Sequence, residues 1–525
     1  MTILAGGKVV DGFSSASYFA DVVMEGRLIV DVIRREGIDA PHYDANATII
    51  DASNLLVTPG FIDAHSHSDA YLILEPSAPS KISQGITTEI NGQCGGSIAP
   101  RYGEARLSSD WASLLGDKLS WRSLKEYREV FDKVRPAINS VQFIGHNTLR
   151  SSVMGYVGAV AGKEQLEKMS AMLEAALDDG GWGLTTGLIY QPGKYSDDNE
   201  VETLARVAAR KGGFYATHMR SEGDFILESI DEVIRLAEKT GIRAEISHLK
   251  TGGAGNWGKI DAVLDKVEGA ISAGKLLGSD RYPYCAAATD LDVVFPDWAG
   301  EGAAKAECAR LADDCISRRI AAEIDASERD WTRVVIGGTW SDVTRKYSGK
   351  SVAEIVASGD YPSPGAAVCD VLRHDQCRTG AFFFTMCEEN LDKIYKKNWI
   401  VPGSDASLRA PWGALGRDFP HPRAYATMPE FFRRVRALGY SLEETVARMT
   451  RIPAERFELP LRGKIAKGYY ADIAVWSEHG FRGVSTYDKP HAFAKGMEYV
   501  FVNGRIGYEK GRFAAAGSGE FLTRN

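Results

Sequence analysis

Six residues of types that bind metal ions stand at the ends of apolar, strand-like segments of this sequence. These residues are His65, His67, Cys94, His218, His248 and Asp405. His65 and His67 are two positions apart in an extended run, so their imidazoles share one face and suit a single cation. Imidazole, thiolate and carboxylate are ligands of Zn²⁺, and the set could hold two ions with positions open for water. The nearby carboxylates of Asp63 and Asp69 could orient a ligand histidine.

The segments that carry these residues predict the fold. Eight strand-like runs occur along the chain: LVTPGFIDAHSH, TTEINGQC, VQFIGHN, GLTTGLIY, GFYATHM, RAEISHL, KLLGSDRYPY and WIVPGSDAS. Helical periodicity separates them at residues 125–137, 162–178, 199–211, 224–239 and 259–274. Strands that alternate with helices predict an α/β fold, here a (β/α)₈ TIM barrel, with the chemistry at the carboxyl ends of the strands.

Two further regions complete the predicted organisation. Residues 1–56 and 460–525 both read as short alternating strands with glycine turns, so we expect them to form one small β-domain. The barrel then spans residues 57–459. Residues 285–398 separate the seventh and eighth strands by more than a βα connection needs, which predicts an inserted, partly helical lid.

The composition excludes several classes of protein. A chain of 525 residues with 44% hydrophobic and 25% charged residues is typical of globular proteins rather than disordered or fibrous ones. The net charge of −8, without a basic block, gives no reason to expect a nucleic-acid partner. No stretch approaches the roughly 20 apolar residues that span a bilayer, and seven cysteines without a CxxC pair argue against a secreted disulfide scaffold. We therefore expect a cytoplasmic protein that acts on a small molecule.

Motifs along nearly the whole chain resemble those of a known family. They are HSHSD at 65–69, GQCGG at 92–96, GLIYQPGKYS at 187–196, THMRSEG at 217–223, SHLKTGGAGNWGK at 247–259, RYPY at 281–284, GSD at 403–405 and HPRAYAT at 421–427. Together they resemble the D-aminoacylase (N-acyl-D-amino-acid deacylase) family of the amidohydrolase superfamily. The resemblance implies a zinc-dependent enzyme that hydrolyses N-acyl-D-amino acids to a carboxylate and a free D-amino acid.

The resemblance also implies roles for individual residues. Cys94, His218 and His248 would hold a tightly bound zinc ion. A second, weaker metal position would be framed by His65, His67 and Asp405.

The same resemblance, together with the chemistry of metal-activated water, suggests catalytic and substrate-binding groups. Asp405 would take a proton from the water and deliver it to the leaving nitrogen, and Tyr190 would donate a hydrogen bond to the oxyanion. The α-carboxylate of the substrate would be bound by Lys250, Tyr282 and Arg423.

Departures from the family pattern bear on the substrate. Residues 290–302 contain no arginine to bind an acidic side chain, which favours a neutral or aromatic one. The stretch from Asp405 to His421 is longer than usual, so a related amidohydrolase acting on another amide, an N-carbamoyl group or a cyclic imide remains an alternative. Two further alternatives are a Cys94 thiolate nucleophile and a barrel that only binds ligands. The sequence leaves open whether the protein is a monomer or a homo-oligomer.

Overall fold

The computed structural model describes residues 1–35, 43, 45–105, 114–514 and 517–524. Within these residues, one sheet of three parallel strands runs in the order β6 (Phe61–Asp63), β7 (Ile86–Asn91) and β8 (Asn139–Gln142). A second parallel sheet has the order β17 (Ile400–Pro402), β13 (Leu277–Arg281), β12 (Arg243–Ile246), β11 (Phe214–His218), β10 (Gly183–Gly187) and β9 (Ile144–Gly145). All eight predicted runs contribute to these sheets, so the prediction of an α/β fold with parallel strands is confirmed.

The two parallel sheets lie next to each other at both of their edges. Phe143 alone separates β8 from β9 along the chain. At the other edge, the amide of Ala64 donates to the carbonyl of Pro402 over 3.1 Å, and Ser66 and Ala406 form a parallel bridge. The carboxyl ends of all these strands therefore face the same side of the molecule, which is where the candidate site residues stand in the sequence.

Helices that the sequence predicts connect the parallel strands. They are α4 (Leu124–Val134), α6 (Lys163–Asp178), α7 (Asp198–Arg210), α8 (Ile226–Thr240) and α9 (Ile260–Ser272). In α8, Ile226, Ile230 and Val233 recur at helical spacing and are buried in the main core. The helix ends at Gly241, whose left-handed φ of 69° stops it.

The remaining helices of this part flank the strands more irregularly. They are α1 (Tyr71–Leu74), α2 (Pro79–Ile82), α5 (His146–Met154), α15 (Glu388–Tyr395), α16 (Arg423–Ala437), α17 (Leu442–Met449) and α18 (Arg451–Arg456). Leu391, Ile394 and Tyr395 of α15 are buried in the main core. Searching the described helices finds none that is long and apolar enough to cross a membrane.

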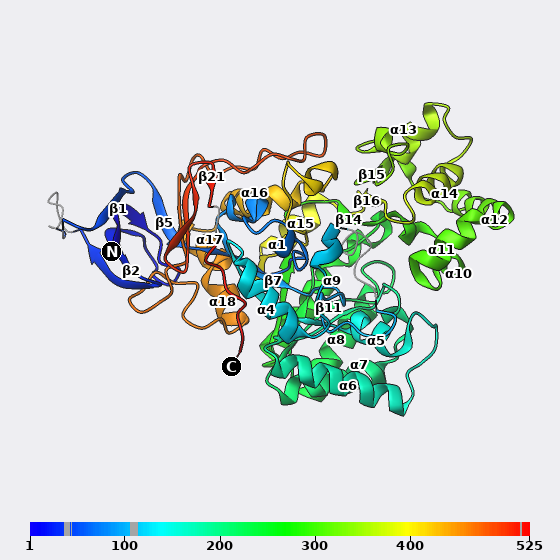
Figure 1. The fold of residues 1–525 in the computed structure, drawn as a ribbon, viewed down its shortest axis with the longest axis horizontal. Helices are drawn as coiled ribbons and strands as arrows, with labels where there is room; N and C mark the ends of the chain where they lie inside the picture. The colour runs from blue at the N-terminus through cyan, green and yellow to red at the C-terminus, as the bar shows by residue number, and fades with distance from the viewer. Residues whose placement is uncertain (36–42, 44, 106–113, 515–516, 525) are drawn as a thin grey trace.

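Strands from both ends of the chain share one sheet. Its N-terminal members are β1 (Thr2–Val9), β2 (Tyr18–Glu25), β3 (Leu28–Arg34), β4 (Thr48–Asp51) and β5 (Leu56–Pro59). Its C-terminal members are β18 (Ile473–Trp476), β19 (Met497–Val502), β20 (Arg505–Glu509) and β21 (Arg512–Phe513). The two groups meet where β5 pairs antiparallel with β18. Figure 1 shows this sheet at one end of the long axis.

Gly60 lies at the chain's crossing from the terminal sheet into the first parallel strand. Strand β5 of the terminal sheet ends at Pro59, three residues beyond position 56, where the predicted N-terminal part of the β-domain ends. Strand β6 of the parallel sheet begins at Phe61. A Cβ on Gly60 would lie 2.2 Å from the side chain of Thr87, so a glycine is required for this close approach.

The long connection between β13 and β17 forms a unit with its own core. It contains an antiparallel sheet in the order β14 (Ala287–Asp290), β16 (Gly380–Phe383) and β15 (Val334–Ile336). Its helices are α10 (Asp297–Gly300), α11 (Ala303–Ala312), α12 (Asp314–Asp325), α13 (Val352–Ala357) and α14 (Pro364–His374). Leu311, Ile320, Ile355 and Leu372 are buried in a core separate from the main one. The helices of this unit lie at the opposite end of the molecule from the terminal sheet (Figure 1).

Trp476 joins the terminal sheet to the parallel strands and supplies a test of this packing. The indole is fully buried, with its ring centre 5.9 Å from that of Phe61 in β6 and 5.0 Å from that of Phe432 in α16. We expect Trp476→Ala to lower the free energy of unfolding by about 3–5 kcal/mol, because it leaves a cavity between these layers. Denaturant unfolding measures the loss. Phe13→Ala, at a side chain that is 53% exposed, is the control and should stay within about 0.5 kcal/mol.

Candidate metal centre and active site

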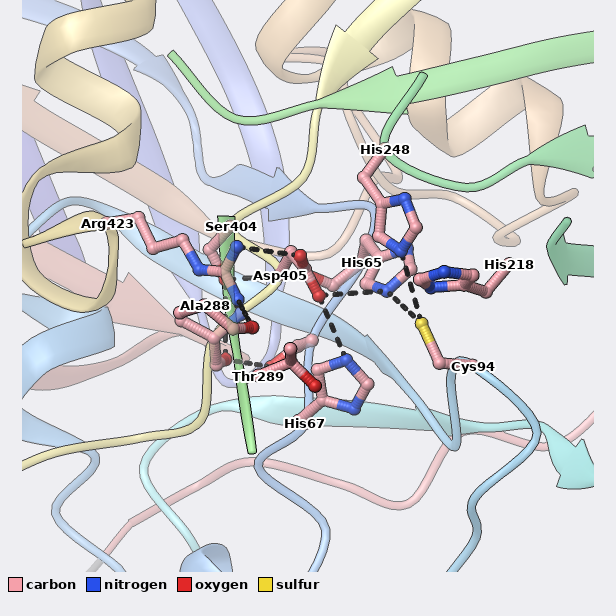
Figure 2. Close-up of polar contacts among 12 residues, drawn as sticks. His65, His67, Cys94, His218, His248, Ala288, Thr289, Ser404, Asp405 and Arg423 are labelled. Atoms are coloured by element: carbon pink, nitrogen blue, oxygen red, sulfur yellow. Dashed lines mark hydrogen bonds and ion pairs between the residues drawn. The ribbon is translucent and has the colours of Figure 1, made fainter. Parts of the chain in front are cut away.

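The six predicted metal-binding residues come together in two overlapping groups. One group contains His65, His67, Cys94 and Asp405, and the other contains Cys94, His218 and His248. Within each group, one ligand atom from every residue lies within 4.8 Å of the others. Figure 2 shows these side chains pointing toward one another, with dashed lines that join the Cys94 sulfur to His65 and His248.

Short segments after the parallel strands place these residues, and three of them have an unusual backbone. Cys94, His248 and Asp405 have φ angles of 53°, 38° and 49°, in the left-handed region that non-glycine residues rarely adopt. Such a conformation costs about 1–3 kcal/mol per residue and persists only where surrounding contacts hold it. At Asp405 one such contact is a hydrogen bond from its amide to the carbonyl of His65, over 2.8 Å. The fold therefore turns these three side chains inward against local preference.

Distances within the groups fit a site built for cations. The Cys94 sulfur lies 3.3 Å from Nε2 of both His65 and His248. An oxygen of Asp405 lies 3.1 Å from Nε2 of His67 and 3.5 Å from Nε2 of His65. Both ring nitrogens of His218 are buried and have no hydrogen-bond partner within the described residues. A buried imidazole without a hydrogen-bond partner, beside a thiolate and a second imidazole, matches the donors that a zinc ion requires.

Charges around the site keep its acidic ligands ionised. Burial alone would raise the pKa of Cys94, but the charges of His65 and His248 hold that pKa well below its ordinary value. Burial would likewise raise the pKa of Asp405, but the Arg423 guanidinium, 2.8 Å away, and then His248 hold it well below the usual range. Thiolate and carboxylate are the forms that bind metal ions.

A carboxylate that the sequence interpretation did not include orients the histidines. Asp280, near the end of β13, contacts Nδ1 of His65 over 3.2 Å and accepts the amide hydrogen of His248 over 3.0 Å. Asp63 instead accepts from Lys81 over 2.9 Å, and Asp69 accepts from Gln142 over 2.6 Å. The ring contact therefore belongs to Asp280, not to Asp63 or Asp69. The sequence did contain a clue to Asp280, because this carboxylate directly precedes the RYPY motif at the end of a predicted strand.

Glu222 is a second functional residue that the sequence interpretation missed. It forms ion pairs with Lys250 and His248 and lies 3.5 Å from Nε2 of His218. The motif THMRSEG contained it four positions after His218, but no role was assigned to it.

The three residues predicted to bind the substrate carboxylate are also neighbours. The guanidinium carbon of Arg423 lies 4.5 Å from the ring centre of Tyr282, and the ammonium of Lys250 lies 6.0 Å from it. All three side chains line one cavity of about 990 Å³ together with Cys94 and His248. Cationic and hydroxyl donors thus stand in the same cavity as the candidate metal ligands.

Tyr190 packs against the candidate ligand His218 and reaches the first strand of the inserted unit. Its ring centre is 4.8 Å from that of His218, and its hydroxyl is 3.5 Å from the Thr289 hydroxyl in β14. Burial, and then the charge of Cys94, raise the pKa of Tyr190 well above its ordinary value. The hydroxyl therefore keeps its proton and remains a hydrogen-bond donor.

Comparisons with known proteins identify the family. A sequence model of the amidohydrolase family matches residues 48–508. A curated N-acyl-D-glutamate deacylase from Alcaligenes xylosoxydans xylosoxydans is 32% identical and covers 96% of this chain and 92% of its own length. D-aminoacylase from the same organism is 31% identical, with 99% and 97% covered. The chain belongs to the D-aminoacylase family of amidohydrolases.

A solved structure agrees with this assignment to the D-aminoacylase family. The N-acyl-D-glutamate deacylase from Bordetella bronchiseptica, complexed with zinc and a phosphonate inhibitor, superposes with a TM-score of 0.82 at 30% identity and covers 99% of both chains. The resemblance inferred from the motifs is confirmed, and this member of the D-aminoacylase family is a metal-dependent hydrolase of linear amides.

The contacts of Asp280 predict a measurable effect on metal binding. We expect Asp280→Asn to weaken metal affinity by about 10–100-fold, because the amide cannot hold the His65 ring as an ionised carboxylate does. Metal content after dialysis against a competing chelator measures this. The control is Asp231→Asn, which removes a carboxylate paired with Lys266 on the outer helices and should leave metal content unchanged. Equal metal content in the two variants would contradict the role given to Asp280.

Proposed function

We propose that this protein hydrolyses the amide bond of N-acyl-D-amino acids, releasing a carboxylate and a free D-amino acid. The observation that carries the proposal is the meeting of two metal-binding groups with Lys250, Tyr282 and Arg423 in one cavity. Amide hydrolysis needs an activated water, and an amino-acid substrate needs cations for its carboxylate. The activities named for the curated relatives support the same substrate class.

Zinc is the metal that we propose for this site. Cys94, His218 and His248 would hold the tightly bound ion, and His65, His67 and Asp405 a second, weaker one. The zinc in the related deacylase structure supports the choice of metal. When bound, zinc lowers the pKa of water toward about 7 and polarises the scissile carbonyl.

Asp405 is the proposed general base and acid. Its carboxylate faces His65 and His67 on one side and the Arg423 guanidinium on the other, which restrains its orientation. The ionised carboxylate accepts a proton from the attacking water. It then delivers that proton to the nitrogen of the leaving D-amino acid, which departs as the amide bond breaks.

Three residues are proposed to bind the substrate carboxylate, and one to stabilise the oxyanion. Lys250 and Arg423 supply positive charge near the Tyr282 ring, and the buried Tyr282 hydroxyl supplies a donor. Tyr190, held protonated beside His218, donates to the oxygen that becomes negative during attack. Anchoring the carboxylate on one side of the metal site would allow the cavity to distinguish D from L substrates.

We further propose that neutral or aromatic side chains are preferred. Asp290, Asp292 and Glu307 line the cavity on the inserted unit. Burial raises the pKa of Glu307 to about 7, and burial followed by the charge of Glu307 raises the pKa of Asp292 well above its ordinary value. The part of the cavity lined by these three residues therefore disfavours ionised carboxylates, and the same effect disfavours an acidic side chain of the substrate.

The architecture around the site is part of the proposal. Hydrogen bonds at both edges of the two parallel sheets support one closed (β/α)₈ barrel. We propose residues 57–459 as this barrel, with the small β-domain of residues 1–56 and 460–525 beside it. Residues 285–398 would act as a lid that walls the substrate cavity, and the part from Leu291 to Phe383 has a core of its own.

Metal content and stereospecific activity test the proposed reaction together. We expect the purified protein to contain zinc and to hydrolyse N-acetyl-D-leucine but not N-acetyl-L-leucine, with loss of activity on chelation and recovery on adding zinc. Asp405→Asn should lower kcat by about 10²–10⁴-fold, because the proton then has no carboxylate to accept it. The measurements are the rate at which acetate is released from each substrate and the zinc content of the purified protein.

The control for this experiment is Asp418→Asn, which removes a carboxylate paired with Arg409 from the same loop. It should change kcat by far less than Asp405→Asn. Full activity without metal would overturn the proposal. A zinc protein that opens cyclic imides or cleaves N-carbamoyl groups, yet ignores both acetylated enantiomers, would identify a different amidohydrolase reaction.

A substrate panel tests the side-chain preference. We expect kcat/KM for N-acetyl-D-leucine or N-acetyl-D-phenylalanine to exceed that for N-acetyl-D-glutamate by about tenfold or more, because an ionised side chain would be buried beside Asp292 and Glu307, where burial already disfavours the charged form of a carboxyl group. Asp292→Asn should bring the kcat/KM values of the neutral and the D-glutamate substrates closer together. Asp297→Asn, at a carboxylate of the same cavity that is 98% exposed, should leave the ratio unchanged. A higher kcat/KM for the D-glutamate substrate would contradict the preference.

A further inference from the structure

Glu222 joins a predicted metal ligand to a predicted substrate-binding residue. It lies between β11 and α8, and its side chain is 15% exposed. One of its oxygens, Oε1, is 3.0 Å from Nδ1 of His248 and forms an ion pair with the ammonium of Lys250. Its other oxygen is 3.5 Å from Nε2 of His218. A single carboxylate therefore contacts three residues of the cavity.

The spacing of Lys250 and His248 creates a conflict that this carboxylate resolves. The Lys250 ammonium lies 2.8 Å from Nδ1 of His248, close enough to donate a hydrogen bond to that nitrogen. If Lys250 donated there, the ring proton of neutral His248 would sit on Nε2. The Nε2 atom faces the Cys94 sulfur over 3.3 Å, so it is the atom that a shared metal would need unprotonated.

An acceptor at Glu222 allows the opposite arrangement. Oε1 can accept from the Lys250 ammonium and from an Nδ1–H group of His248 at once, because a carboxylate oxygen has two acceptor positions. The proton of His248 then lies on Nδ1, and the lone pair of Nε2 points toward Cys94. In the described part of the chain, the hydrogen bonds of Lys250 go only to Glu222 and His248.

We propose that Glu222 is a positioning residue that fixes the tautomer of His248 for metal binding by drawing Lys250 away from Nδ1. The same ion pair holds the ammonium in place for the substrate carboxylate. Metal retention and carboxylate recognition therefore depend on one side chain. This inference rests on the proposed function, because it assigns His248 to zinc and Lys250 to the substrate.

Zinc retention in Glu222→Gln tests the proposal without relying on catalysis. A glutamine side chain carries no charge, so the ion pair that holds the Lys250 ammonium is lost and Lys250 is freed to donate to His248. We expect zinc transfer to a chromogenic chelator to be about 10–100-fold faster than from the wild type. KM for N-acetyl-D-leucine should rise as well. The matched control is Glu232→Gln, which removes a part-buried carboxylate paired with Arg220 over 3.1 Å and should retain zinc normally.

A double variant separates tautomer control from a general structural role. Adding Lys250→Met to Glu222→Gln removes the competing donor, so zinc retention should return toward the wild-type rate while substrate binding stays weak. Failure of this rescue, or normal zinc retention in Glu222→Gln, would overturn the inference. The wild type is assayed alongside the variants. If the wild type holds no zinc, the proposed function is wrong. If it binds zinc and hydrolyses substrate normally, a negative result overturns only the role proposed for Glu222.

Discussion

Compensation of buried charge is the constraint on which the rest of this site depends. Cys94, Asp405 and Glu222 bring negative charge into the cavity, and Lys250 and Arg423 bring positive charge. An isolated buried charge costs several kcal/mol, so each must lie beside an opposite charge or a metal ion. Parallel strands supply the geometry, because their carboxyl ends gather side chains from distant parts of the sequence at one edge. The site is thus a balance of charges that the fold makes possible.

The unusual backbone at three candidate ligands follows from the same constraint. Cys94, His248 and Asp405 adopt left-handed φ angles, which an extended continuation of their strands would avoid. Turning the chain there directs side chains from β7, β12 and β17 toward a common point. Gly403 shows how tight this convergence is, because a Cβ there would lie 2.7 Å from the Cβ of His65. The left-handed backbone costs free energy at these candidate ligands, and the packing of the strands beneath them offsets that cost.

The sequence predicted the elements better than it predicted the contacts between them. Helical periodicity located α4, α6, α7, α8 and α9 to within a few residues, because each buries one apolar face. The two-residue spacing of His65 and His67 was likewise a local signal. The pairings of Asp280 with His65 and of Glu222 with Lys250 join residues 215 and 28 positions apart, and no local pattern records such contacts. The switch from β5 to β6 at Gly60 was also missed, since it depends on the position of Thr87 across the fold.

The inserted unit shows how one scaffold can separate chemistry from selectivity. The candidate metal ligands all stand at or just after the carboxyl ends of parallel strands of the main body. Asp290, Asp292 and Glu307 of the cavity wall instead belong to a unit with its own hydrophobic core. Because the two cores are separate, side chains on the inserted wall can change without disturbing the packing that holds the metal ligands. Tyr190 lies at this junction, with its ring against His218 and its hydroxyl near Thr289 of β14. Tyr190, the proposed oxyanion donor, is therefore the residue through which a change in the inserted unit would reach the reaction.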